Sequence, residues 1–349
     1  MEFIKNVRIK NFKSICNIEF EAKRINVLVG KPNAGKSNIL EALTFYSSFF
    51  SEENKFKEVL RFNDIYDLTH FGEIDKIIGI ELDNNSMYFR PNKSNKGFSL
   101  LFCPESYFQI ESFDSLLVLI RKLELKNNRS YYFYAESPET IRGQLNVIHN
   151  TISINPYIFK WPFKFEQSHN YSLESPFGSN LTNAIVGNKE LLTIAKELFS
   201  DYDLNLVIEK NTNNIEIQRA EGNLIFKIPF NHVSDTLVRL LFFQAAILTN
   251  TDKVILFEEP EAHAFPPYML QMTHSLINSQ TNQFFVATHS SYIINELIQK
   301  ADPKDIAVHV VYYKENSTHI HTLTQPEIDD YLDNGVDILM GMDAYEISE

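Results

Sequence analysis

The feature that most constrains the fold is an eight-residue loop between an apolar run and an amphipathic run. The loop reads Gly-Lys-Pro-Asn-Ala-Gly-Lys-Ser over residues 30–37 and satisfies G-x-x-x-x-G-K-[S/T] at every fixed position. Residues 25–29 before it form a compact apolar run, which is typical of a strand buried on both faces. After it, apolar residues recur at helical spacing from Ile39 to Phe49. The order of strand, glycine loop and helix predicts an α/β fold.

The residue types in this loop suit the binding of a triphosphate. Glycines let the backbone curl so that N–H groups point at phosphate oxygens, and the following helix presents its positive end to them. Lys36 is expected to reach the β- and γ-phosphates, and Ser37 to hold Mg²⁺. We therefore predict ATP and Mg²⁺ as cofactors. The residues expected to contact the nucleotide are Gly30, Lys31, Pro32, Asn33, Ala34, Gly35, Lys36, Ser37 and Asn38.

A second apolar run, residues 254–257, ends in the carboxylates of Glu258 and Glu259. A buried strand of a parallel sheet delivers such side chains to the sheet edge where nucleotides bind. Glu258 is expected to orient Mg²⁺, and Glu259 to accept a proton from the attacking water. Taken alone, the pair would be interpreted as an acidic loop after a strand. The complete phosphate loop favours the catalytic interpretation.

A third apolar run, residues 283–287, is followed closely by His289. A single histidine is usually structural, but its place after the acid pair makes His289 a candidate sensor of the γ-phosphate. The predicted catalytic residues are Lys36, Glu259 and His289, and the predicted metal ligands are Ser37 and Glu258.

Composition limits the class of partner. The formal net charge is -13, whereas contacts to nucleic-acid phosphates need clustered Lys and Arg. The two cysteines, Cys16 and Cys103, suit neither a disulfide framework nor a zinc site, which favours a reducing compartment. No apolar run approaches the ~20 residues of a membrane-spanning helix, and no signal-peptide core is expected at the N-terminus. We therefore expect a cytoplasmic protein without a membrane partner.

The chain is expected to contain an N-terminal lobe with the phosphate loop over residues 1–90. A mainly helical insertion or lid over residues 91–200 separates it from a C-terminal lobe over residues 201–349, which carries the acids and the histidine. Helices are predicted over residues 112–126, 137–148, 188–199 and 235–248. A meander of short strands is predicted over residues 204–209, 214–219 and 224–228.

At these motifs the chain resembles the ABC-type ATPase domains of the AAA-labelled, SMC/RecF-like group. Such domains occur in overcoming-lysogenisation nucleases and in bacterial anti-phage defence ATPases. The resemblance covers residues 1–50 and 228–300, in the family's order. It is carried by the opening strand and turn (residues 9–14), Lys36 and Ser37, the signature region (residues 234–239), the Walker B and D-loop segment (residues 258–263) and the switch segment (residues 288–290).

The resemblance implies a P-loop NTPase with an ABC-type head, in which a mixed sheet is accompanied by N-terminal antiparallel strands, here with a large α-rich insertion. It also implies a head-to-tail homodimer or higher oligomer, in which Ser234 caps the ATP of the partner subunit in trans. Two departures suggest slow hydrolysis or a tightly held ATP state. Thr236 replaces the signature glycine, and Glu258 replaces the usual aspartate, which displaces the carboxylate by ~1.5 Å.

Three functions remain open. The first is a sensor, switch or scaffold that controls a separately encoded effector in anti-phage defence. It is favoured because a fused Toprim nuclease would carry a D-x-D motif on a strand after His289. The tail there is short and has no such motif on a strand. The alternative is a DNA repair or recombination ATPase of the RecF/SMC type that binds DNA directly. Its candidate basic patch comprises Lys5, Arg8, Lys10, Lys13, Lys23, Arg24 and Lys31.

The third function is the ATPase subunit of a transporter. Two features argue against it: the large insertion and the Glu-Glu-Pro-Glu form of the acid motif. A ribonuclease role for Arg142 and His149 rests on a two-residue pattern that is common by chance, and is not favoured.

Overall fold

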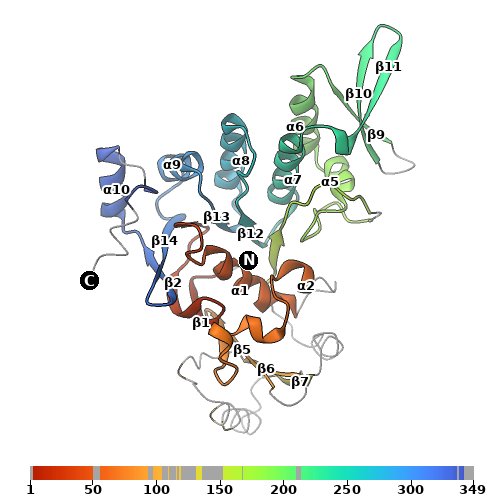
Figure 1. The fold of residues 1–349 in the computed structure, drawn as a ribbon. Helices are drawn as coiled ribbons and strands as arrows, with labels where there is room; N and C mark the ends of the chain where they lie inside the picture. Colours follow the sequence, from red (N-terminus) through yellow and green to blue (C-terminus); the bar gives the residue numbers. More distant parts are fainter. Residues whose placement is uncertain are drawn as a thin grey trace. The chain divides into compact units, whose positions relative to one another are not determined.

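The structure of the chain is a computed structural model. It describes residues 3–49, 56–92, 97–103, 109, 115, 118, 131–135, 152–166, 168–209, 214–335 and 338–341. The chain divides into two compact units. One, here the N-terminal unit, combines Glu2–Ile154 with Pro303–Glu349; the other, here the central unit, is Asn155–Asp302. Figure 1 labels the helices and strands of both.

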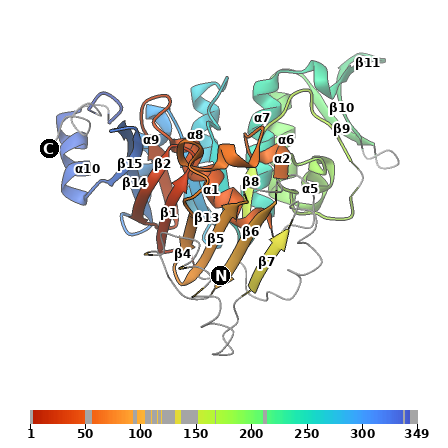
Figure 2. The same cartoon turned by 60° about the horizontal axis from the view of Figure 1, so that its bottom comes forward.

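The N-terminal unit contains an antiparallel sheet in the order β2-β1-β4-β5-β6-β7. Figure 2 shows most of these strands side by side. The strands are β1 (Asn6–Phe12), β2 (Ile15–Glu21), β4 (Ile78–Leu82), β5 (Asn85–Pro91), β6 (Phe98–Cys103) and β7 (Tyr131–Ala135). The apolar side chains of β1 alternate into the core, and Val7 pairs with Phe20 on one side and Leu82 on the other. The N-terminal antiparallel strands that the resemblance implies are thereby confirmed.

Helix α1 (Lys36–Ser48) packs on this sheet through aromatic rings. The Phe45 ring lies 5.7 Å from that of Phe12 and 5.0 Å from that of Phe89. Phe49, one turn further along, lies 6.2 Å from Phe98. Rings at positions i and i+4 share one helix face, so α1 presents a continuous aromatic strip to the strands. The strip fixes the helix that follows the phosphate loop.

The same unit contains a second group of strands. Strand β3 (Ile25–Val29), buried along its whole length, pairs in parallel with β14 (Ile306–Lys314), and β14 pairs antiparallel with β15 (Ser317–Thr322). Helix α10 (Gln325–Asn334) follows and ends at Gly335 in the left-handed conformation. Short elements complete the unit: α2 (Phe56–Val59), η1 (Ile65–Leu68) and η2 (His70–Gly72).

Strand β14 buries His309 completely. Its Nδ1 lies 2.8 Å from Thr322 Oγ1, and its Nε2 lies 3.4 Å from Asn26 Oδ1. Burial, with a smaller contribution from the Lys23 ammonium, lowers the pKa of the His309 imidazole to about 3. The side chain is therefore a neutral hydrogen-bonding group of the core.

This histidine should make stability depend on pH. In the unfolded chain His309 binds a proton below its ordinary pKa of 6.5, whereas in the folded chain it stays neutral down to about pH 3. The contribution of neutral His309 to the free energy of unfolding is therefore complete above pH 6.5 and is lost as the pH falls toward 3. Between pH 7 and pH 5 this group should lower the unfolding free energy by about 2 kcal/mol. Urea titrations should show that His309→Gln removes that component, whereas a control at exposed His232 keeps it. Equal losses in both variants would contradict the assignment.

The central unit contains two parallel strands and a series of helices. Strand β12 (Val254–Glu258) pairs in register with β13 (Gln283–Ala287). The helices are α5 (Leu181–Gly187), α6 (Lys189–Ser200), α7 (Asp235–Thr249), α8 (Pro266–Asn278) and α9 (Ser291–Lys300). Helix α7 is buried nearly all round, as its apolar sequence predicts. Neighbouring helices pack in the sequence α5–α6–α7–α8–α9.

The remaining elements of the central unit agree with the predicted meander. Strands β9 (Asn205–Glu209), β10 (Asn214–Glu221) and β11 (Leu224–Pro229) form an antiparallel sheet in the order β11-β10-β9, which extends beyond α6 in Figure 1. Also described are η3 (Phe230–His232) and β8 (Ile154–Tyr157). The helices predicted over residues 112–126 and 137–148, together with Arg142 and His149, lie outside the described residues apart from isolated positions. Strands β6 and β7 fall within the predicted insertion, so its described part contains strands as well as helices.

Candidate nucleotide site

The glycines of the phosphate loop are required by close packing within the N-terminal unit. A Cβ atom at Gly30 would lie 2.1 Å from the Val311 carbonyl oxygen of β14. At Gly35, where φ is 107°, a Cβ atom would lie 2.1 Å from Thr318 Oγ1 of β15. The left-handed backbone at Gly35 also excludes most other residues. The hairpin β14–β15 therefore shapes the loop from outside it.

Lys36 is buried within the loop that precedes it. Its Nζ donates to the carbonyl oxygens of Gly30, at 2.7 Å, and Lys31, at 2.9 Å. The side chain retains only 6% of its accessible surface. These bonds hold the ammonium over the loop, where the sequence predicts that phosphate oxygens are bound.

A directed series of hydrogen bonds ties the loop to distant parts of the unit. Asn38 Nδ2 donates to Ser14 Oγ at 2.6 Å, and Thr318 Oγ1 donates to the Ala34 carbonyl at 3.0 Å. The two hydroxyls lie 2.6 Å apart. Because the Thr318 proton is committed to Ala34, Ser14 is the donor in this middle bond. The sequence analysis named Asn38 but missed the roles of Ser14 and Thr318; Ser14 stood in the recognised opening segment, whereas Thr318 carried no local signal.

The loop fits a triphosphate with Mg²⁺. Among the described residues no side chain caps the start of α1, and its first turn carries no acid, so the positive helix end faces the loop without a competing anion. Ser37, the second residue of α1, offers a hydroxyl oxygen, a hard donor of the kind that Mg²⁺ prefers. When bound, the ion would supply charge neutralisation at the phosphates.

The acid pair and the histidine belong to the central unit. Glu258 is the last residue of β12, and Glu259 follows it with a left-handed φ of 44°. The Glu259 backbone N–H donates to the Ala287 carbonyl at 2.8 Å, which joins the ends of β12 and β13. His289 Nε2 lies 3.5 Å from Glu259 Oε1. The structure thus brings Glu259 and His289 together at one end of the two strands.

The acid three residues beyond Glu258, Glu261, was not assigned a role by the sequence analysis. Its Oε1 accepts hydrogen bonds from Thr288 Oγ1, at 2.7 Å, and from the His289 backbone N–H, at 2.6 Å. Thr288 Oγ1 in turn accepts from the Ser290 backbone N–H at 3.0 Å. The signal that could have found it is the third and last glutamate of the Glu-Glu-Pro-Glu motif.

The predicted signature region begins α7. Ser234 is the N-cap residue, is exposed, and makes no side-chain capping bond within the described chain. Thr236, which stands at the family's glycine position, donates from Oγ1 to the His263 carbonyl at 2.8 Å. The signature region is therefore tied to the loop that carries Glu259.

The predicted site residues lie in both units. The N-terminal unit holds the loop residues from Gly30 to Asn38, and the central unit holds Glu258, Glu259, His289 and Ser234. Within each unit, the hydrogen bonds described above connect the predicted residues to neighbouring segments.

Most basic residues of the proposed DNA patch have other partners. Arg8 Nη2 lies 2.6 Å from Glu19, Lys13 pairs with buried Glu41, and Arg24 Nη2 lies 3.2 Å from Asp305. Lys23 donates to the Pro303 carbonyl, and Lys10 is buried.

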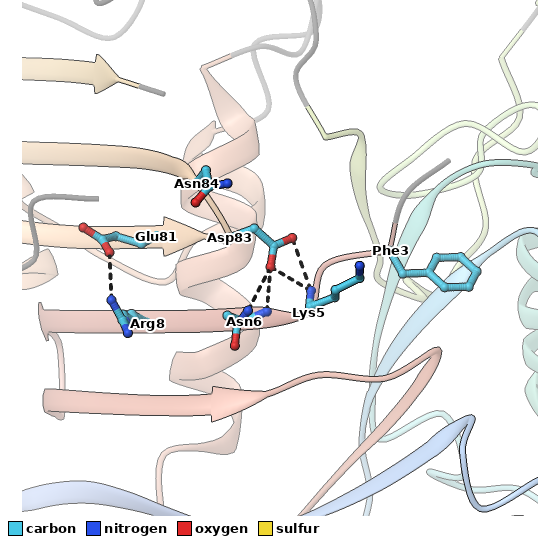
Figure 3. A pocket seen from close by; sticks show the side chains of 7 residues that line it. All are labelled: Phe3, Lys5, Asn6, Arg8, Glu81, Asp83 and Asn84. Carbon is cyan, nitrogen blue, oxygen red and sulfur yellow. Dashed lines mark hydrogen bonds and ion pairs between the residues drawn. The ribbon is translucent and has the colours of Figure 1, made fainter. Parts of the chain in front are cut away.

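A cavity of about 440 Å³ lies beside Lys5 and Arg8 in the N-terminal unit (Figure 3). Carboxylates also line it: Asp83 accepts from the backbone N–H groups of Lys5 and Asn6, and buried Glu81 lies 3.8 Å from Arg8. This wall mixes both signs of charge, unlike a surface that follows a phosphate backbone.

Comparisons with known proteins agree with the fold and the loop. A family model described as "AAA domain, putative AbiEii toxin, Type IV TA system" matches residues 25–295. An ATP/GTP phosphatase of Helicobacter pylori is 25% identical over 340 residues, which cover 87% of this chain and 90% of that protein. Uncharacterized protein MJECL10 of Methanocaldococcus jannaschii is 41% identical over 59 residues, 17% of this chain and 27% of that protein.

Two solved structures share the fold. An SMC head bound to the C-terminal winged-helix domain of ScpA aligns with a TM-score of 0.54 at 16% identity, over 93% of this chain and 99% of that chain. An SMC head with an extended coiled coil, bound to the C-terminal domain of ScpA from Pyrococcus furiosus, aligns with a TM-score of 0.51 at 13% identity, over 95% and 99%.

The chain has the fold of an SMC head and carries the phosphate loop of a P-loop NTPase. The family match spans most of the chain, and the chain belongs to the AAA-domain family of the AbiEii description. The predicted fold class is confirmed. Among the described helices, none combines the length and apolarity that crossing a membrane requires.

Proposed function

We propose that this protein hydrolyses ATP slowly, dimerises head to tail around ATP, and acts as a sensor and switch for a separately encoded effector in anti-phage defence. The observation that carries the proposal is the phosphate loop, with Lys36 held over it and the start of α1 facing it. The relative named an ATP/GTP phosphatase supports hydrolysis, and the toxin–antitoxin wording of the family description supports a second gene product.

The chain's own residues take distinct roles in this proposal. Lys36 and the loop N–H groups bind the triphosphate, and Ser37 and Glu258 hold Mg²⁺. Glu259 accepts the proton of the attacking water, while His289, 3.5 Å from it, senses the γ-phosphate. Ser234, exposed at the start of α7, contacts the ATP of a second copy. The longer Glu258 and the bonded Thr236 support slow turnover.

The DNA-binding alternative has weaker support. Five of its seven basic residues are buried or bound to a carboxylate or carbonyl group. We also propose a cytoplasmic location, because both cysteines are free thiols and Cys103 is buried.

Sedimentation with nucleotide tests the switch. The chain should double its mass with ATP but not with ADP, because the γ-phosphate is bound from both sides. Ser234→Arg should stay monomeric in ATP while still binding ATP, since only the contact in trans is blocked. The matched control is Ser200→Arg, at an exposed serine ending α6, which should dimerise normally. A monomer under all conditions, together with salt-sensitive DNA binding, would instead support the DNA alternative.

A further inference from the structure

The loop after β13 is held by a carboxylate that the roles above do not use. Glu261 Oε1 accepts from both Thr288 Oγ1 and the His289 backbone N–H, at 2.7 and 2.6 Å. A charged acceptor makes such bonds stronger than neutral ones. The backbone that carries the His289 imidazole is thus fixed by a side chain from the loop after β12.

This anchoring determines which group His289 faces. The Glu259 N–H is bonded to the Ala287 carbonyl, so the two loops are joined at Ala287 as well as through the Glu261 carboxylate. From this frame the imidazole reaches to 3.5 Å from the Glu259 carboxylate. Without Glu261, the His289 backbone N–H would lose the hydrogen bond that ties it to the acid-bearing loop.

The other oxygen of Glu261 lies in a charged cluster with α7. Within the described chain, Glu261 Oε2 and Arg239 Nε are both buried and lack hydrogen-bond partners. The Arg239 guanidinium lies 4.7 Å from the Phe159 ring centroid. Burial lowers the pKa of Arg239, and the charges of Asp235, Glu261 and Glu259 oppose that shift. Arg239 thus provides a positive charge near the carboxylate that anchors the switch loop.

We propose that Glu261 is a positioning residue that holds the His289 backbone so that the imidazole faces Glu259 and the reacting end of ATP. The inference rests on the proposed hydrolysis. In this proposal the Glu261 carboxylate acts through the His289 backbone and does not contact ATP. Its loss should therefore lower kcat without weakening ATP binding.

The test compares Glu261→Ala with Glu261→Gln, measuring phosphate release and ATP affinity on the full chain. Glu261→Ala should lower kcat ~10- to 100-fold at unchanged Kd for ATP, because a displaced catalytic group costs rate and not binding. Glu261→Gln keeps an amide oxygen as acceptor and should recover part of that rate. Combined with His289→Ala, the Glu261→Ala change should add little, since both remove the same interaction.

The matched control is Glu296→Ala, which removes the carboxylate that contacts His274 at 2.7 Å on the same unit and should leave kcat unchanged. Histidine NMR gives a readout independent of turnover: the His289 side-chain signals should shift in Glu261→Ala and not in the control. An unchanged kcat and unchanged His289 signals in Glu261→Ala would overturn the inference while wild-type hydrolysis persists. Absence of hydrolysis in the wild type would instead refute the proposed function.

Discussion

Replacing Glu259 with glutamine should nearly abolish ATP turnover while ATP binding survives, and ATP-bound dimers should accumulate. A positioned general base contributes ~10²- to 10⁴-fold to rate, and glutamine cannot accept the proton. The Glu259 side chain is 53% exposed and meets His289 at 3.5 Å, so the substitution removes little packing. Phosphate release should fall at least ~100-fold at an unchanged Kd for ATP, with the dimer persisting in sedimentation after wild-type dimers have dissociated.

The control for this substitution is Glu190→Gln, at an exposed first-turn glutamate of α6 in the same unit, which should retain wild-type turnover. If Glu259→Gln hydrolysed ATP within a few-fold of wild type, the proton acceptor would have to be another group.

Replacing Lys36 with alanine should remove nucleotide binding. The ammonium is buried and held over the loop, and charge-assisted hydrogen bonds to phosphate contribute about 1.5–3 kcal/mol each. Losing two of them should weaken ATP binding at least ~100-fold. The increase in Tm that saturating ATP gives the wild type by mass action should then disappear.

Lys36 also bonds its own loop, so a loss of binding could follow from a damaged loop. Lys36→Met keeps most of the length and apolar bulk of the side chain but removes the ammonium with its hydrogen bonds, and should lose ATP to the same extent. Lys31→Ala alters an exposed lysine of the same loop and should bind ATP far better than Lys36→Ala. Unaltered ATP affinity in Lys36→Ala and Lys36→Met would refute the phosphate-loop assignment.

Local patterns predicted the elements because the relevant signals are short-range. The alternation in β1, the apolar run of β3, and the glycine loop with its helix each lie within a few residues of one another. The meander and α7 were recognisable for the same reason. Strand β1 continues through Phe12, because Phe12 pairs with Ile15 and its ring packs against α1.

Contacts between distant segments could not be predicted in this way. The Ser14–Thr318 bond joins residues 304 positions apart, and a lone threonine on a strand has no pattern that identifies it. Lys13 appeared as a surface cation, yet its pairing with buried Glu41 of α1 exists only in the folded unit. Glu261 belonged to a recognised motif, but its two bonds depend on how the loops after β12 and β13 meet.

The dependence of the phosphate loop on β14 and β15 has a consequence for biosynthesis. Gly30, Gly35 and Ala34 are shaped by Val311 and Thr318, which the ribosome adds nearly three hundred residues later. A nascent chain that has made the loop and α1 still lacks the hairpin that sets the loop's curvature. The loop therefore acquires its mature curvature only after residues 311–318 have been synthesised and have folded against it.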